Sequence, residues 1–221
     1  MMLESRFDGP YNRVATEYIQ ETYPAYWPSI RAYGWSHPAL VPYINEDPDI
    51  MCSLMNLGWS RIINFGGSGY FETDIPMSNI RTLEAKMSIY NSVNYAFFGT
   101  TSSYEGVYYW QGYLWLSASK QAGALSASNN VTFNIANGQI SVQNINTSIP
   151  SYGSSKMLIG KVGSVNGYAG KLSSFSVVGA NNKGYQFVPF VRNSEVELLD
   201  VINLSLVKRY GSFSITKTLN A

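Results

Sequence analysis

The stretch from residue 131 to residue 145, VTFNIANGQISVQNI, constrains the fold more than any other part of the sequence. Its centre, Asn137-Gly138, supplies two residues that tolerate positive φ, which a two-residue type I′ hairpin turn requires. Closing this turn predicts an antiparallel register that pairs Ala136 with Gln139, Ile135 with Ile140, and Phe133 with Val142. The last four of these side chains are apolar and fall on one face, so the turn and the alternation predict the same hairpin.

Apolar and polar residues alternate in other short segments after residue 58. In RTLEAKMSI, residues 81–89, the side chains of Leu83, Ala85, Met87 and Ile89 share one face, as in a strand with one wet side. Further strands are predicted at 70–75, 93–98, 107–110, 113–117, 157–159, 171–178, 185–191 and 212–216. Pro189 lacks a backbone donor and should place its strand at a sheet edge or bulge. About ten short strands separated by turn signals favour an antiparallel sandwich, and we expect a jelly roll.

The first 58 residues differ in composition from the rest of the 221-residue chain. They hold six of the nine prolines and carry a charge balance of −4, against +5 for the remainder. We therefore expect two functional parts. Residues 1–58 would form an N-terminal segment for attachment or oligomerisation, and residues 59–221 would form the jelly-roll domain.

Short helices are predicted in the N-terminal segment. In DPDIMCSLMNLGW, residues 47–59, Asp47 is a candidate N-cap, Pro48 suits the first helical position, and Gly58 marks the end. A second helix is expected over residues 12–22, with one stripe formed by Val14, Tyr18 and Thr22.

Between these helices, residues 23–43 alternate prolines with large aromatic side chains. Proline disfavours both a long helix and a central strand, so an irregular segment is expected here. Such a segment cannot bury its own rings and must pack on the β domain or on another protein subunit. The predicted assembly anchors are Tyr23, Tyr26, Trp27, Tyr33 and Trp35.

Charge and composition disfavour several classes of partner. A formal net charge of +1 gives no long-range field for nucleic acid, so we expect no nucleic-acid partner. No apolar run approaches about 20 residues and no signal peptide is recognisable, so we expect no membrane insertion. Cys52 and His37, each the single residue of its kind, cannot make a zinc site without further ligands, and no Asp-rich loop suits calcium. We therefore expect neither a metal nor a cofactor.

A long acid-free run argues against glycoside hydrolysis, which needs a pair of carboxylates. From Gly106 to Ser194 the sequence contains no Asp or Glu. Glu72 and Asp74, two residues apart on one predicted strand face, are the remaining candidate pair, and a hydrolase stays the lesser alternative. We expect no catalytic residue and no enzyme activity.

An aromatic cluster in YEGVYYWQGYLWL, residues 104–116, is the feature that a binding hypothesis can use. Tyr108 and Trp110 alternate onto one face, and Tyr109 shares the other face with Val107. Tyr113 and Trp115 repeat this alternation after Gln111-Gly112. A sandwich strand has one core-facing side, so some rings must face solvent, a ligand or a neighbouring subunit. The candidate glycan or subunit contacts are Tyr108, Tyr109, Trp110, Tyr113 and Trp115.

Seven short motifs then point to a family by their order. They are GYFETDI at 69–75, FFG at 97–99, LIG at 158–160, GKLSSF at 170–175, FVP at 187–189, LD at 199–200 and YGSF at 210–213. Together they resemble the concanavalin A-like, laminin G-like jelly-roll domains of appendage proteins of tailed bacteriophages, over roughly residues 60–216. Gln186, Leu199 and the pair Leu206-Val207 depart from that pattern, in which Asp, Tyr and Phe-Tyr are usual.

The resemblance implies a non-enzymatic virion structural protein of the head-fibre or tail-fibre type, exposed on the particle surface. Residues 1–58 would bind other virion proteins, and a homotrimer is expected by analogy with fibres. The jelly roll would contact a bacterial surface glycan. The alternative from another class is a carbohydrate-binding, lectin-like module, because the fold hosts lectins and glucanases as well as scaffolds.

Overall fold

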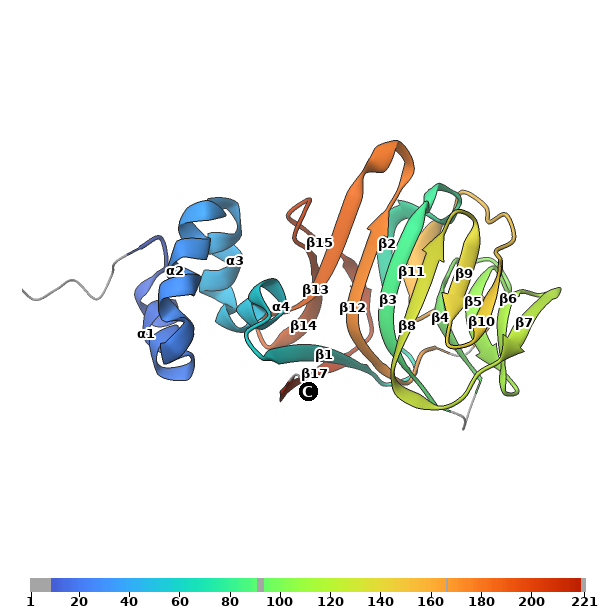
Figure 1. Cartoon of the computed structure of the whole chain (residues 1–221), viewed down its shortest axis with the longest axis horizontal. Helices are drawn as coiled ribbons and strands as arrows, with labels where there is room; N and C mark the ends of the chain where they lie inside the picture. The colour runs from blue at the N-terminus through green and yellow to red at the C-terminus, as the bar shows by residue number, and fades with distance from the viewer. Residues whose placement is uncertain (1–8, 91–93, 166, 220–221) are drawn as a thin grey trace, which may run out of the picture.

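The computed structural model describes residues 9–90, 94–165 and 167–219, and in these ranges the chain is mainly β with a helical N-terminal segment (Figure 1). The helices lie at one end of the molecule, and two antiparallel sheets form the rest. The helical elements are α1 (Arg13–Thr22), η1 (Pro24–Tyr26), α2 (Trp27–Ser36), η2 (Pro38–Leu40), α3 (Val41–Glu46), η3 (Pro48–Ile50) and α4 (Met51–Met55).

The segment 23–43 is helical, not irregular as its prolines led us to expect. Each proline lies in the first turn of a helix, where its missing N–H group would have no intrahelical partner in any case. The same junction occurs three times: Tyr23, His37 and Asp47 each end one helix with φ between −139° and −130° and precede a proline. The prolines therefore start helices and limit them to ten residues.

Two predicted details of the helices are wrong. The stripe expected on α1 lies toward solvent, with Val14 75% exposed, while Ala15, Thr16 and Ile19 form the buried face. The periodicity was compatible with either face, and packing selected the other one. Asp47 does not cap η3 with its side chain, because its carboxylate is held elsewhere, as described below.

The first sheet contains ten strands within the described ranges. Their order is β10-β9-β8-β3-β12-β13-β14-β15, and β1, which carries β17 on its other side, also pairs with β12. The bounds are β1 (Trp59–Phe65), β3 (Thr82–Ile89), β8 (Ser128–Ala136), β9 (Gln139–Val142), β10 (Ile145–Ser148), β12 (Lys171–Val178), β13 (Gly184–Arg192), β14 (Glu195–Asp200), β15 (Ser205–Leu206) and β17 (Phe213–Leu219).

The second sheet contains seven strands in the same ranges, in the order β16-β2-β11-β4-β5-β6-β7. Its strands are β2 (Tyr70–Pro76), β4 (Tyr95–Gly99), β5 (Gly106–Trp110), β6 (Tyr113–Ser117), β7 (Lys120–Ala124), β11 (Lys156–Ile159) and β16 (Lys208–Tyr210). The strand expected at 93–98 begins in a position, 93, that lies outside the described residues, and β4 is its described part.

The hairpin predicted around Asn137-Gly138 is confirmed. Both turn residues have positive φ, 52° and 71°, and β8 pairs with β9 through Ile135 with Ile140 and Ala136 with Gln139. The apolar side chains of this hairpin, Phe133 and Ile140 among them, enter the core between the two sheets.

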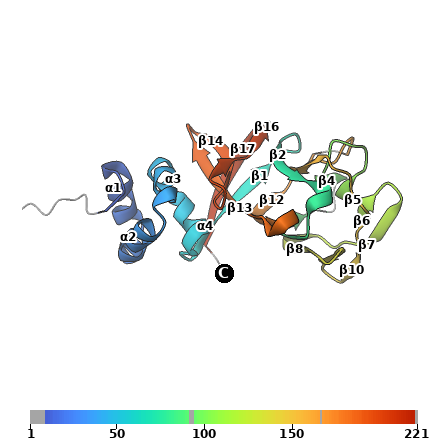
Figure 2. The same ribbon diagram turned by 90° about the horizontal axis from the view of Figure 1, so that it is seen from above.

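The helices and the first sheet share a second apolar core. Ile19, Ile30 and Ile44 of the helices are fully buried with Val188 and Phe190 of β13. The neighbouring Phe187 faces the core between the sheets, so β13 is covered on both faces. Figures 1 and 2 show the helices stacked beside β13 and β14 at the end of the molecule that carries β1 and β17.

A buried ion pair joins the helical segment to the sheet. Oδ2 of Asp47 accepts hydrogen bonds from Nη1 of Arg61 on β1 at 2.6 Å and from the backbone N–H of Val191 on β13 at 2.7 Å. Asp47 and Arg61 are 7% and 4% exposed. One carboxylate oxygen thus links two strands that do not pair with each other.

A second polar cluster lies close by. Oδ1 of Asp49 accepts hydrogen bonds from the hydroxyl groups of Tyr18 and Tyr23 at 2.9 and 2.7 Å and lies 3.3 Å from Nζ of Lys217 on β17. Burial favours the neutral acid, but the two phenol hydrogen bonds and the charges of Lys217 and Arg61 outweigh it and lower the pKa of Asp49. The helical segment is therefore fixed to β1, β13 and β17 by charge as well as by apolar packing.

We predict that Asp47→Asn lowers the free energy of unfolding by about 3 to 5 kcal/mol, because it leaves the Arg61 guanidinium buried without its counter-ion. Urea unfolding of the whole chain measures this. The adjacent Glu46 makes an exposed ion pair with Arg192 at 3.0 Å, so the control Glu46→Gln should cost less than about 1 kcal/mol. Equal costs for the two variants would contradict the role given to Asp47.

Candidate functional site

The predicted aromatic residues lie on β5 and β6 in the second sheet. These strands are joined by the turn Gln111-Gly112, in which both φ angles are positive, and they pair Tyr108 with Trp115 and Tyr109 with Leu114. Alternation sends Tyr109 into the core between the sheets, where it stacks on Tyr95, and sends Tyr108 to the outer face. Tyr109 is therefore not an exposed contact residue, contrary to expectation.

The outer face of these strands carries a small pocket lined by aromatic rings. Its lining is Tyr104, Tyr108, Trp110, Trp115 and Ala118, and its volume is about 190 Å³. The rings of Tyr108 and Trp115 are nearly parallel, with 6.4 Å between their centroids, and the Tyr104 ring lies 5.9 Å from that of Tyr108. We call this the aromatic pocket.

Three of the five predicted contacts, Tyr108, Trp110 and Trp115, thus share one site. Tyr113 is 41% exposed on β6 but does not line the pocket. Tyr104 was not singled out from the sequence, because it precedes β5 and belongs to no alternating pattern. It lies in a turn with φ of 58°.

Glu105 holds the turn that carries Tyr104. Its Oε2 accepts a hydrogen bond from the hydroxyl of Thr100 at 2.8 Å, and its Oε1 accepts one from the backbone N–H of Gly153. The backbone closes the same turn, since the N–H of Thr100 donates to the carbonyl of Glu105 at 2.9 Å. This carboxylate therefore has a structural role beside the pocket.

The aromatic pocket is uncharged. Burial, helped by the nearby Tyr104, raises the pKa of Tyr108 to about 12, so its hydroxyl stays neutral and donates to the carbonyl of Ser117 at 3.0 Å. Nε1 of Trp115 is buried and has no hydrogen-bond partner among the described residues. Flat rings with few polar groups suit a ligand that presents both an apolar face and hydrogen-bonding groups.

The five predicted assembly anchors divide into three groups by exposure. Tyr23 is buried inside the molecule and bonds to Asp49, so it does not face a partner as expected. Trp27 and Tyr33 are half-buried against the second core. Tyr26 and Trp35 are exposed, at 40% and 64%. Two of the five therefore remain available at the surface of the helical segment.

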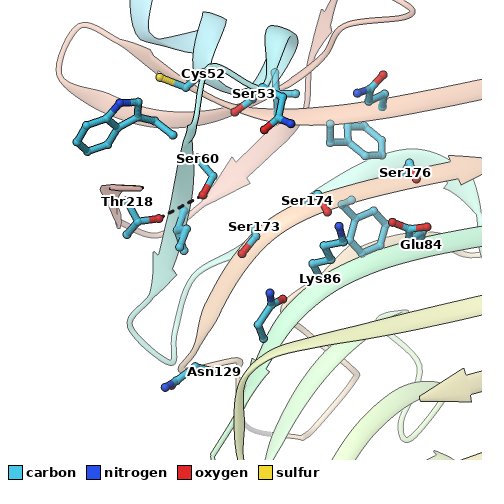
Figure 3. A pocket seen from close by; sticks show the side chains of 18 residues that line it. Cys52, Ser53, Ser60, Glu84, Lys86, Asn129, Ser173, Ser174, Ser176 and Thr218 are labelled. Carbon is cyan, nitrogen blue, oxygen red and sulfur yellow. Dashed lines mark hydrogen bonds between the residues drawn. The ribbon is translucent and has the colours of Figure 1, made fainter. Parts of the chain in front are cut away.

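A larger polar groove, of about 700 Å³, lies on the outer face of the first sheet (Figure 3). No sequence pattern predicts this groove, because it forms where the sheet divides. On one edge of β12, β1 pairs with Lys171 and Leu172, and β13 pairs with Phe175 and the residues after it. Ser173 and Ser174 lie between these two pairings and pair with neither β1 nor β13. This leaves a gap between β1 and β13, and α4 lies over it.

Pro189 marks the same division. The last residue of β13 that pairs with β12 is Phe187, so the proline lies two residues after the strand has left its neighbour. There β13 pairs on one side with β14, as in the register of Pro189 with Leu198. β13 is therefore not an edge strand, contrary to what Pro189 led us to expect, because it lies between β12 and β14. The proline instead lies where β13 has separated from β12 and pairs with β14 alone.

A β-bulge in β12 shapes the floor of the groove. The register with β3 shifts between Leu172 and Ser174, so the adjacent Ser173 and Ser174 both line the groove. Behind the bulge, the buried hydroxyl of Tyr168 accepts from the N–H of Ser88 at 2.9 Å and lies 2.9 Å from the carbonyl of Lys171. This single hydroxyl therefore forms hydrogen bonds with backbone groups that the irregular strand pairing leaves without a partner.

We predict that Tyr168→Phe lowers the free energy of unfolding by roughly 1 to 3 kcal/mol, because buried backbone groups lose their partner while the ring volume is kept. Chemical denaturation checks this, and Tyr113→Phe, at an exposed ring, should change it by less than about 0.5 kcal/mol. A Tyr168→Phe protein as stable as the parent would remove the support assigned to the bulge.

The carboxylates considered for hydrolysis are engaged in ion pairs on the second sheet. Oδ1 of Asp74 lies 2.6 Å from Nζ of Lys156, and Oε1 of Glu72 lies 4.0 Å from both Lys156 and Lys208. Asp74 is widely exposed, with its side chain 89% accessible. Within the described ranges, no group of three His, Cys, Asp or Glu residues could hold a metal ion.

None of the helices in the described ranges has the length and apolar character needed to cross a bilayer. No protein-family model matches the sequence, and no curated protein shows significant similarity to it.

Proposed function

We propose that the protein is a structural subunit of a bacteriophage particle, attached through its helical segment and displaying the two-sheet part outward. The observation that carries this proposal is the separation of two surfaces. Exposed Trp35 and Tyr26 lie on the helices, and the aromatic pocket lies on β5 and β6 at the opposite end (Figures 1 and 2). A chain with an attachment surface at one end and a recognition surface at the other suits a head- or tail-fibre component.

The topology supports a jelly roll of the concanavalin A-like kind within this proposal. The chain crosses between the sheets several times: β2 lies in the second sheet, β3 in the first, β4 to β7 in the second, β8 to β10 in the first, β11 in the second and β12 in the first. Such interleaving of antiparallel strands is the connectivity of jelly rolls.

The aromatic pocket is the proposed contact for a bacterial surface glycan. Its volume of about 190 Å³ is below the roughly 300–1,000 Å³ of sites for larger ligands, so it suits one sugar ring. The tryptophan and tyrosine faces cover the apolar face of such a ring, and no charged side chain lines the pocket. A free lectin-like module would use the same pocket. Finding the chain in a phage particle would distinguish a structural subunit from such a module.

We predict that Trp110→Ala weakens binding of the recognised sugar at least about tenfold, equivalent to about 1.4 kcal/mol, because it removes a wall of the pocket. A glycan array followed by calorimetric titration of the full chain measures this. Tyr113→Ala is the matched control, since Tyr113 pairs with Trp110 across the strands but lies outside the pocket. Equal losses in both variants, or a blank array, would contradict the proposed contact.

We predict that Trp35→Ser reduces self-association, for which a homotrimer is proposed, without lowering the melting temperature, because the ring is exposed in the single chain. Size-exclusion chromatography with light scattering measures the change. Ile202→Ser removes a comparably exposed apolar side chain, at 55%, from the β part and should leave the mass unchanged. A parent protein that stays monomeric at high concentration would count against the trimer.

A further inference from the structure

The polar groove differs from the aromatic pocket in size, lining and position. It lies on the outer face of the first sheet, whereas the pocket lies on the outer face of the second. We propose that the groove binds an uncharged oligosaccharide of several sugar units. This proposal rests on the proposed recognition of glycans and adds a second, longer subsite to it.

The charges of the groove favour a neutral ligand. Among the described residues that line it, Glu84 and Lys86 carry opposite charges, and the other polar side chains are hydroxyls and amides. A phosphate- or carboxylate-bearing ligand would need an excess of cationic side chains. Hydroxyl and amide groups both donate and accept hydrogen bonds, as the hydroxyl groups of a sugar do. The lining therefore matches a polyhydroxylated chain.

Several of these groups are not used within the protein. The hydroxyls of Ser173, Ser174 and Ser176 have no hydrogen-bond partner in the described part of the chain, although each is partly buried. The bulge in β12 directs the adjacent Ser173 and Ser174 to the same side, where regular alternation would direct one of them away. Figure 3 shows both beside the gap, with Ser60 of β1 on the opposite wall.

The shape of the groove suits a chain of sugar units. Its volume of about 700 Å³ compares with about 190 Å³ for the aromatic pocket. Trp59 and Ile62 of β1 add apolar surface beside the hydroxyl-lined floor. The wall formed by Ser60 is itself fixed, because its hydroxyl lies 3.2 Å from that of Thr218 on β17. The groove is therefore built by packed strands.

The test uses the full chain with Asn130→Ala and Gln186→Ala combined. Both residues line the groove and are exposed, so their loss should leave the melting temperature unchanged. The matched control is Asn134→Ala, at an exposed position of the same strand, β8, outside the groove. The probes are neutral oligosaccharides of one to eight units on an array, with the strongest binder then titrated calorimetrically.

We expect the double variant to bind the longer oligosaccharide at least about tenfold more weakly, while Asn134→Ala binds like the parent and binding of single sugars is unchanged. Backbone amide signals of Ser173 and Gln186 should shift on titration of the parent with the longer sugar.

Unchanged affinity in the double variant, with a loss in Trp110→Ala, would overturn the groove proposal and leave the pocket standing. No sugar binding by the parent would overturn both. Binding of extended peptides that the double variant loses, without sugar binding, would assign the groove to a protein partner and overturn the proposal.

Discussion

The arrangement of the molecule depends on one carboxylate oxygen, Oδ2 of Asp47. This oxygen accepts hydrogen bonds from the guanidinium of Arg61 on β1 and from the backbone N–H of Val191 on β13. Both residues lie where their strands have separated from the common neighbour β12. An unpaired backbone donor and a buried guanidinium would each be costly there, and Asp47 satisfies both. Because Asp47 belongs to the junction before η3, the same contact determines where the helical segment sits on the sheet.

Two consequences follow from the separation of β1 and β13. The outer face of β13 is left free for the helices, whose isoleucines pack on Val188 and Phe190, so the helical segment shares a core with the strands. The gap between the separated strands also becomes the polar groove, with the bulge of β12 as its floor. The packing of the helical segment on the sheet and the polar groove thus have a common structural origin, while the aromatic pocket arises independently from the alternation of β5 and β6.

The parts of this structure that local pattern controls could be predicted. The Asn137-Gly138 hairpin, the mainly β class of fold and the alternation of Tyr108 and Trp110 onto one face all follow from turn chemistry and period two, whereas which of the two faces points outward does not. The stripe of α1 and the role of Asp47 could not, because each depends on which distant element packs against it. The groove has no local signal either: its serines look like ordinary strand residues, and only Pro189 hints that the sheet divides there.

In the proposed function, the helical segment attaches the chain to a phage particle and the aromatic pocket is displayed. Electron cryomicroscopy of phage particles that contain this chain tests this proposal most directly. The account predicts that Trp35 and Tyr26 contact a neighbouring particle protein or a second copy, and that Tyr104, Trp110 and the polar groove face outward. A particle in which the aromatic pocket is covered by another virion protein while the helices project into solvent would contradict it.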